Sequence, residues 1–186
     1  RELTRFDFAK IGLAGCGRWV DWPRRWRDAV DALRDTVTPV AVVYADWQAA
    51  RAPDPRDVIE HAAQLGCGAV LFDTFDKQRG SLLDHFGVDE LQCWSARVRR
   101  FSARVVLAGS LTTQSIPRLV PLRPDYIAVR GAACRQGRAG RIDPTRVRAL
   151  AAAIRDVEHT VNANRCEDDV LRGPDRTVQV ARGEGS

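Results

Sequence analysis

Short runs of apolar residues recur about every 30 residues along this chain. Each run is four to eight residues long, and polar positions do not alternate with apolar ones inside it. This pattern is typical of parallel strands that are buried on both faces of a sheet. The runs predict five strands: Phe6–Leu13, Val40–Tyr44, Ala69–Phe72, Val105–Ala108 and Tyr126–Val129.

Stretches with helical spacing of apolar residues separate these strands. Two of them open with an aspartate that can cap a helix and a proline suited to its first position, at Asp54-Pro55 and Asp143-Pro144. The expected helices cover residues 22–37, 55–65, 90–101, 113–119 and 144–157. Alternating strands and helices indicate βαβ units around a parallel sheet. A doubly wound sheet would also satisfy the pattern, although the glycines after the first strand do not form GxGxxG.

The end of the chain differs from the rest. Residues 158–186 are polar, with glycine, Pro174 and scattered charges, and they predict a disordered tail. The expected organisation is one domain over residues 1–157 followed by this tail. No apolar run approaches the roughly 20 residues of a membrane span, so no membrane partner is expected. The chain contains no methionine, which leads us to expect that the natural N-terminus lies upstream.

The five cysteines form no CxxC pair and are odd in number. A disulfide framework and a zinc site are therefore not expected, and a reducing cytoplasm fits best. The three histidines do not fall at the spacing of metal ligands. No metal site is predicted from these residues.

The basic residues point to amine chemistry more than to nucleic acid. The net charge is +5, but the basic residues are spread along the chain, which disfavours a nucleic-acid partner. Of the 29 basic residues, only Lys10 and Lys77 are lysines. Arginine keeps its proton and cannot become an amine nucleophile. Two lysines in such a background are candidates for catalysis through their amines.

Both lysines lie near the ends of predicted strands, where α/β barrels place their catalytic groups. Lys10 belongs to the first strand, and Asp46 follows the second. Asp73 ends the third strand, with Lys77 four residues later, so that one turn of helix would place the two side by side. An amine beside carboxylates can form an imine with a carbonyl substrate while the carboxylates move protons. A surface ion pair is the alternative for Asp73 and Lys77.

Glycine beside a hydrogen-bond donor follows the last two strands. Gly109-Ser110 comes after the fourth, and Arg130-Gly131 after the fifth. Glycine lets an oxyanion approach backbone N–H groups, and serine and arginine add donors. These four residues are the predicted phosphate-binding site.

The motifs at the strand ends, taken in order, resemble one family. They are Lys10-Ile11-Gly12-Leu13, Tyr44-Ala45-Asp46, Leu71-Phe72-Asp73-Thr74 with Lys77, Leu107-Ala108-Gly109-Ser110, Val129-Arg130-Gly131-Ala132-Ala133-Cys134 and Gly140-Arg141-Ile142-Asp143. They resemble (5-formylfuran-3-yl)methyl phosphate synthases of methanofuran biosynthesis. The resemblance covers roughly residues 6 to 157.

The resemblance implies a (β/α)8 TIM barrel, of which this chain would hold the last five βα units. It implies a carbon–oxygen lyase that condenses two molecules of glyceraldehyde 3-phosphate, with loss of phosphate and water, and that needs no cofactor. Lys10, Asp73 and Lys77 match active-site positions of the family, and Asp46 lies in a matching motif. Either lysine could carry the imine.

One departure limits what the family resemblance predicts. Family members begin with further strands, one of which carries a lysine in a Lys-Asn-Pro context, and this chain has no counterpart. A partial barrel exposes strand edges and apolar surface, which favours aggregation or homo-oligomers. The alternatives are another class I aldolase-like barrel lyase on a phosphorylated carbonyl compound and an inactive fragment that binds phosphate ligands.

Overall fold

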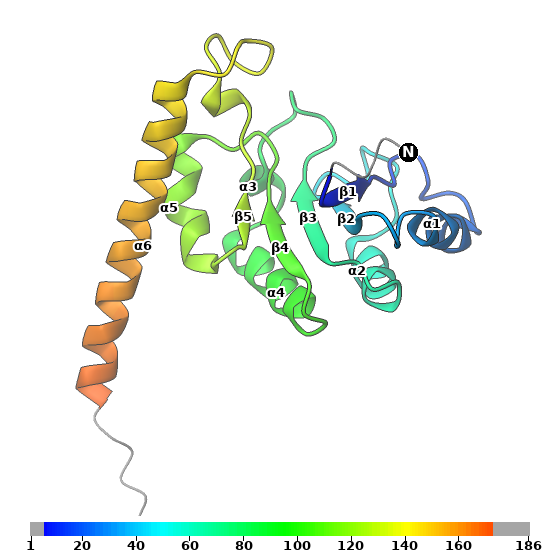
Figure 1. Cartoon of the computed structure of the whole chain (residues 1–186), viewed down its shortest axis with the longest axis horizontal. Helices are drawn as coiled ribbons and strands as arrows, with labels where there is room; N and C mark the ends of the chain where they lie inside the picture. The colour runs from blue at the N-terminus through cyan, green and yellow to red at the C-terminus, as the bar shows by residue number, and fades with distance from the viewer. Residues whose placement is uncertain (1–5, 173–186) are drawn as a thin grey trace, which may run out of the picture.

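The computed structural model describes residues 6–172, and a five-stranded parallel sheet forms its centre. The strands are β1 (Phe8–Ile11), β2 (Thr38–Tyr44), β3 (Ala69–Asp73), β4 (Arg104–Leu107) and β5 (Tyr126–Ile127). Their order in space is their order along the chain (Figure 1). A doubly wound sheet reverses its strand order at a switch point. The strand order of residues 6–172 shows no such reversal. The prediction of an α/β fold with a parallel sheet is therefore confirmed, and the doubly wound sheet is excluded for these strands.

Helices connect the strands. They are α1 (Trp22–Asp31), α2 (Pro55–Gln64), α3 (Leu82–His85), α4 (Val88–Arg99), α5 (Ile116–Leu119) and α6 (Pro144–Arg172). Asp54 caps α2 as predicted, since its carboxylate accepts a 2.8 Å hydrogen bond from the Arg56 backbone N–H. The first helix is shorter than its apolar pattern, because the chain turns after Asp31. The four-residue helix α3 was not predicted, because it is too short to show a period.

The main core lies between one face of the sheet and the helices α1, α2 and α4 (Figure 1). Side chains alternate across a strand, so every second residue of β2, β3 and β4 enters this core. These strand residues are Ala41, Val43, Val70, Phe72, Val105 and Leu107. From the helices, Trp26, Val58 and Val98 pack against them.

The opposite face of the sheet carries a second apolar cluster, formed by Val40, Val42, Ala69, Leu71 and Ala108. No helix of the described part of the chain contributes a residue to this cluster. The cluster borders an open cavity that Phe8 and Tyr126 also line. These two aromatic residues are 38% and 50% exposed, so apolar surface on this face remains accessible.

The first half of the segment predicted to be a disordered tail is helical in the structure. Helix α6 continues past residue 157 and ends at Arg172. Residues 158–172 contain neither glycine nor proline, and the first of each are Gly173 and Pro174. Without a residue that breaks a helix, the segment continues the helix begun at Pro144. Residues 173–186 lie outside the described part of the chain.

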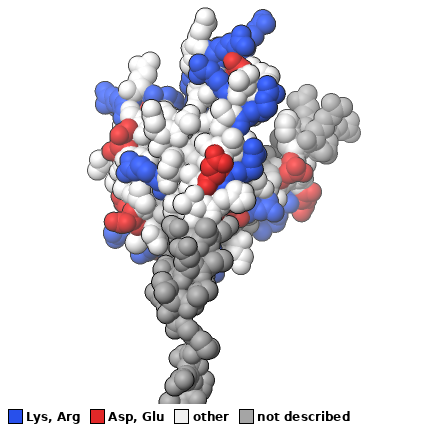
Figure 2. Space-filling view, turned by 90° about the vertical axis from the view of Figure 1, so that its left-hand side faces the viewer, with Lys and Arg blue, Asp and Glu red and all other residues white. Residues whose placement is uncertain are grey.

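Charges are mixed on the face shown in Figure 2, where red and blue side chains lie among one another. Blue side chains are more frequent at its upper end, where the loop before α6 lies. Within the described residues, no helix is both long enough and apolar enough to span a bilayer.

Candidate active site

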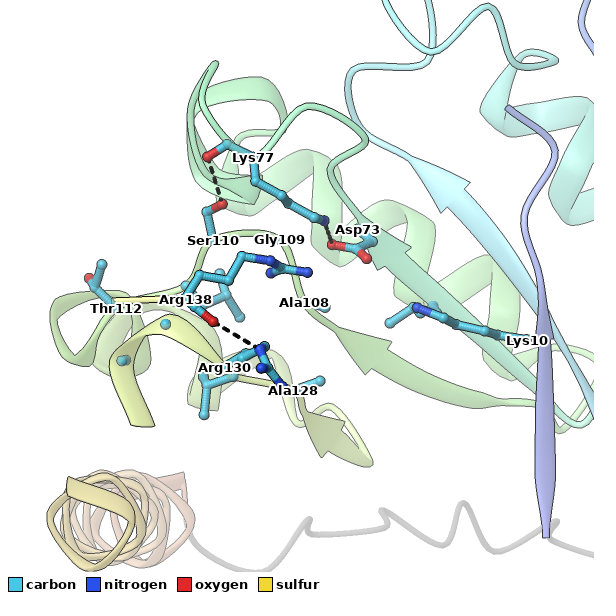
Figure 3. A pocket seen from close by; sticks show the side chains of 15 residues that line it. Lys10, Asp73, Lys77, Ala108, Gly109, Ser110, Thr112, Ala128, Arg130 and Arg138 are labelled. Carbon is cyan, nitrogen blue, oxygen red and sulfur yellow. Dashed lines mark hydrogen bonds and ion pairs between the residues drawn. The ribbon is translucent and has the colours of Figure 1, made fainter. Parts of the chain in front are cut away.

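An ion pair between Lys77 and Asp73 lies at the carboxyl end of β3. The Lys77 ammonium donates to the Asp73 carboxylate and to the backbone carbonyl of Thr74. The two side chains are only 23% and 15% exposed. A fully solvated surface pair would be worth little, but a half-buried pair is less screened by water. Figure 3 shows the pair at the edge of a cavity.

Lys10 enters the same cavity from β1. It pairs in register with Val40 of β2, whose side chain belongs to the apolar cluster to which no helix of residues 6–172 contributes. Figure 3 shows its side chain extending toward the cavity from the side opposite Lys77. Lys10, Asp73 and Lys77 all line this cavity, whose volume is about 370 Å³. Pockets for small molecules have roughly 300–1,000 Å³.

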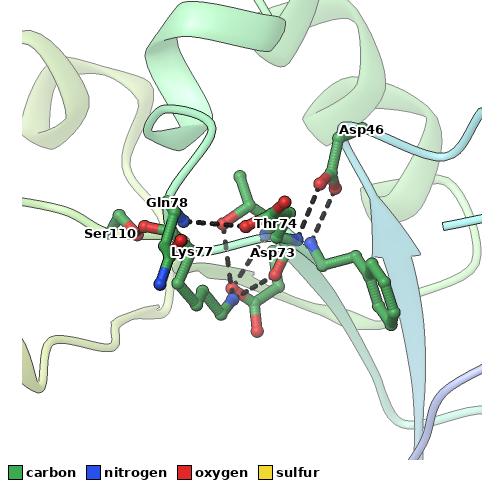
Figure 4. Close-up of polar contacts among 8 residues, drawn as sticks. Asp46, Asp73, Thr74, Lys77, Gln78 and Ser110 are labelled. Carbon is green, nitrogen blue, oxygen red and sulfur yellow. Dashed lines mark hydrogen bonds and ion pairs between the residues drawn. The ribbon is translucent and has the colours of Figure 1, made fainter. Parts of the chain in front are cut away.

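The loop that carries Lys77 is held by Asp46. The Asp46 carboxylate accepts hydrogen bonds from the backbone N–H groups of Phe75 at 2.6 Å and Asp76 at 2.8 Å (Figure 4). Asp46 is 7% exposed and is not among the residues that line the cavity. Its carboxylate therefore fixes the backbone beside Lys77. Sequence reasoning grouped Asp46 with the proton-transfer residues, because a hydrogen bond to a backbone amide leaves no trace in a motif.

Gly109 and Ser110 lie at the carboxyl end of β4, against the same loop. Both have left-handed backbone angles, with φ of +96° and +49°. The Ser110 hydroxyl donates to the Lys77 backbone carbonyl at 3.3 Å. This contact ties the predicted phosphate loop to the lysine loop, and both residues line the cavity.

Gly109→Ala is expected to destabilise the protein by about 1–3 kcal/mol, because alanine rarely adopts this φ. The new Cβ would also lie 2.9 Å from the Thr74 backbone nitrogen. Urea unfolding measures the change. Gly87→Ala is the matched control, since a Cβ there meets nothing within 4 Å. Equal losses in the two variants would contradict the close packing of Gly109.

Arg130 and Gly131 follow β5 and line the same cavity. The structure also brings Arg138 to it, a residue that sequence reasoning missed. The Arg130 Nε donates to the Arg138 backbone carbonyl at 3.0 Å (Figure 3). The signal that could have revealed Arg138 is a stretch from 130 to 142 with four arginines and no acidic residue.

Tyr44 stands beside Asp73 in the register of β2 and β3. Burial raises the pKa of the Tyr44 phenol, and the carboxylates of Asp73 and Asp46 raise it further. The phenol therefore stays protonated at neutral pH and can only donate its proton in a hydrogen bond or accept through its oxygen. Its ring packs edge-on against Phe75 with a centroid distance of 5.8 Å.

Seven of the eight predicted site residues thus line one cavity at the carboxyl edge of the sheet, and Asp46 supports it from outside. Among the described residues, no group of three or more metal-binding side chains comes together. Fold and site define a parallel α/β protein whose strand ends present two amines, one carboxylate and several anion-binding donors.

Comparison with known proteins assigns the family. The family model described as 4-HFC-P synthase matches residues 2–151. This chain belongs to the 4-HFC-P synthase family, and the resemblance predicted from the strand-end motifs is confirmed.

Its relatives include proteins named (5-formylfuran-3-yl)methyl phosphate synthase from methanogens. The chain is 31% identical to that of Methanococcus maripaludis, with 81% of this chain and 66% of the relative covered. It is 33% identical to that of Methanopyrus kandleri, with 80% and 65% covered. The chain therefore spans about 66% of the length of the relatives it matches.

Among solved structures, phosphoribosyl anthranilate isomerase from Thermus thermophilus is 18% identical and has a TM-score of 0.39. It covers 83% of this chain, and 92% of the isomerase is covered. A similarity at this level supports no conclusion about fold or function.

Proposed function

We propose that this chain carries the amine and phosphate-binding part of a synthase that condenses two molecules of glyceraldehyde 3-phosphate to (5-formylfuran-3-yl)methyl phosphate. The observation that carries the proposal is the half-buried Lys77–Asp73 ion pair in one cavity with Lys10. Membership of the family and the names of the relatives agree with it.

The proposed chemistry begins with one lysine amine. After losing its proton, the amine attacks the aldehyde carbon of one triose phosphate and forms an imine with release of water. The protonated imine draws electrons from the neighbouring carbon, so that a base can remove a proton there. Asp73 is the carboxylate of the cavity and is the proposed base. The resulting enamine can then attack the aldehyde of the second triose phosphate.

The second lysine has a different proposed task. The lysine that does not carry the imine is proposed to transfer protons, and Lys77, which touches the Asp73 carboxylate, also orients that carboxylate. Lys10 has an exposed ammonium that reaches the cavity from the apolar face. Either amine has access to a carbonyl carbon in the cavity.

We also propose that the five βα units belong to a (β/α)8 barrel. The sequential strand order and the apolar face without a helix in the described part agree with consecutive barrel strands, whose inner side chains pack against one another. On this proposal the remaining strands would cover Phe8, Leu71 and Tyr126.

Two other functions would use the same lysines and phosphate-binding residues of the cavity. An aldolase-like lyase acting on another phosphorylated carbonyl compound would give a product without a furan ring. An inactive phosphate-ligand-binding fragment would instead be stabilised by phosphate ligands without turnover. The cytoplasm remains the proposed compartment, since the four cysteines described by the structure are free thiols.

Borohydride trapping tests the proposal. The chain is incubated with glyceraldehyde 3-phosphate, reduced, digested and examined by mass spectrometry for an adduct on Lys10 or Lys77. Ultraviolet absorption of the supernatant reports the furan aldehyde. We expect an adduct on one lysine only. Absence of an adduct on both would refute imine chemistry in this chain, and an adduct without a furan product would favour the alternatives.

A further inference from the structure

The segment between η4 (Gly131–Ala133) and α6 contributes Arg138 to the wall of the cavity. We call residues 130–142 the arginine arm, because they contain four arginines and no aspartate or glutamate. The four are Arg130, Arg135, Arg138 and Arg141. In Figure 1 the arm is the yellow loop at the top, and in Figure 2 the same end of the molecule is rich in blue.

The base of the arm is fixed by backbone pairing. Cys134 and Ile142 form an antiparallel bridge, and the Arg135 N–H donates to the Arg141 carbonyl at 2.9 Å. Asp143 closes the base, because its N–H donates to the Ala133 carbonyl at 2.8 Å. Its carboxylate accepts from the Arg135 Nε at 2.7 Å. One arginine of the arm is thus used for structure.

The link between Arg135 and Asp143 is present at neutral pH. The hydrogen bond from Arg135 lowers the pKa of the Asp143 carboxyl, and the Thr145 backbone N–H lowers it further. A lowered pKa means that the carboxylate is lost only when the pH falls below the ordinary range of aspartate, about 3.9. The ion pair that closes the arm between Arg135 and Asp143 is therefore present over the pH range in which triose phosphates are doubly charged.

The tip of the arm turns back toward the cavity. Gln136 and Gly137 have left-handed backbone angles, with φ of +60° and +79°. A Cβ at Gly140 would collide with the Arg135 backbone carbonyl, so only glycine fits there. This tight return places Arg138 on the cavity wall together with Lys10, Asp73 and Lys77. Figure 3 shows the Arg138 side chain pointing into the cavity.

The Arg138 guanidinium has no partner in the described part of the chain. Over residues 6–161, whose side chains are described, no carboxylate lies within ion-pair distance of it. The Nε of Arg130, in contrast, is engaged by the backbone carbonyl of Arg138. Arg138 thus offers its five N–H donors to whatever enters the cavity. A planar guanidinium with free donors suits a phosphate group.

Charge on the cavity wall favours more than one phosphate. The wall carries four cationic side chains and one carboxylate, a formal excess of three positive charges. One phosphate monoester brings about 1.5 to 2 negative charges at neutral pH. Positive charge therefore remains after one phosphate has been bound by Gly109, Ser110, Arg130 and Gly131.

From this geometry we infer a second phosphate site in the cavity, with Arg138 as its binding residue. The inference rests on the proposed function, in which two triose phosphates meet in one cavity. Arg138 holds the phosphate of the substrate that is not attached to lysine, and so selects a phosphorylated second substrate. The arm fixes the backbone from which this guanidinium extends into the cavity.

Binding stoichiometry tests this inference without turnover. The probe is sn-glycerol 3-phosphate, which has the phosphate of the substrate but no carbonyl. Isothermal titration is expected to give two sites per chain for the parent and one for Arg138→Ala. Arg141→Ala is the matched control, because Arg141 lies on the same arm but does not line the cavity, and it should keep both sites. Arg138→Lys, which keeps a charge, should retain the second site with affinity reduced about tenfold.

Three outcomes decide the matter. Two sites in Arg138→Ala, or one site in both that variant and the parent, would overturn the inference. Borohydride trapping with glyceraldehyde 3-phosphate is run beside the titration, and Arg138→Ala should form as much lysine adduct as the parent. If the parent forms no adduct but loses one of two sites on mutation, the imine proposal fails and the second phosphate site stands. Circular dichroism of each variant confirms that it is folded.

Discussion

Arginine in place of Lys77 is expected to abolish furan aldehyde formation while the protein stays folded. The guanidinium keeps a positive charge beside Asp73, so the ion pair survives in a modified geometry. It cannot release a proton at neutral pH, and therefore it serves neither as a nucleophile nor as a proton donor and acceptor. Loss of such a group lowers turnover by about 10²- to 10⁴-fold. Product formation measured in the ultraviolet gives the rate.

Lys10→Arg is the companion variant, and the pair assigns the imine. The lysine that forms the imine loses its borohydride adduct when it is replaced, whereas replacement of the other lysine leaves the adduct and removes turnover. A double variant should show neither. If each single variant kept both adduct and turnover, the amines of this cavity would have no part in the reaction.

The sheet and its strand ends could be predicted from the sequence for a physical reason. Strands buried in a parallel sheet must be apolar throughout, so the run from Ala69 to Phe72 is visible without any structure. The carboxyl ends of parallel strands lie at one edge of a sheet, so the sequence predicts that Lys10, Asp73 and Gly109 lie near one another, and all three line one cavity. The scarcity of lysine then marked two members of the site.

Asp46 and Arg138 show where such reasoning stops. The partners of Asp46 are the backbone amides of Phe75 and Asp76, 29 and 30 residues further along the chain, and a backbone amide has no sequence signature. Arg138 reaches the cavity only because the arm folds back at Gly137, a turn set by backbone angles. The end of α6 was also missed, since polar residues without glycine or proline can extend a helix that is already formed.

Asp46→Ala is expected to destabilise the protein by about 2–4 kcal/mol, although Asp46 does not line the cavity. The change leaves the N–H groups of Phe75 and Asp76 without the carboxylate that accepts from them at 2.6 and 2.8 Å. Water can replace that acceptor only by loosening the loop that carries Lys77. We therefore expect faster hydrogen exchange at these two amides, a lower unfolding midpoint in urea and a large loss of lysine adduct.

Asp46→Asn and Asp54→Ala separate this role from general damage. Asparagine has one oxygen and one amide group, so it can accept from only one of the two N–H groups and should fall between parent and alanine. Asp54 caps α2 through the Arg56 N–H, and its replacement should cost about 1 kcal/mol without changing the adduct. If Asp46 instead transferred protons, Asp46→Asn would be as stable as the parent and as inactive as Asp46→Ala. If Asp46→Asn were as stable as the parent, with unchanged hydrogen exchange at the amides of Phe75 and Asp76, Asp46 would be assigned to proton transfer.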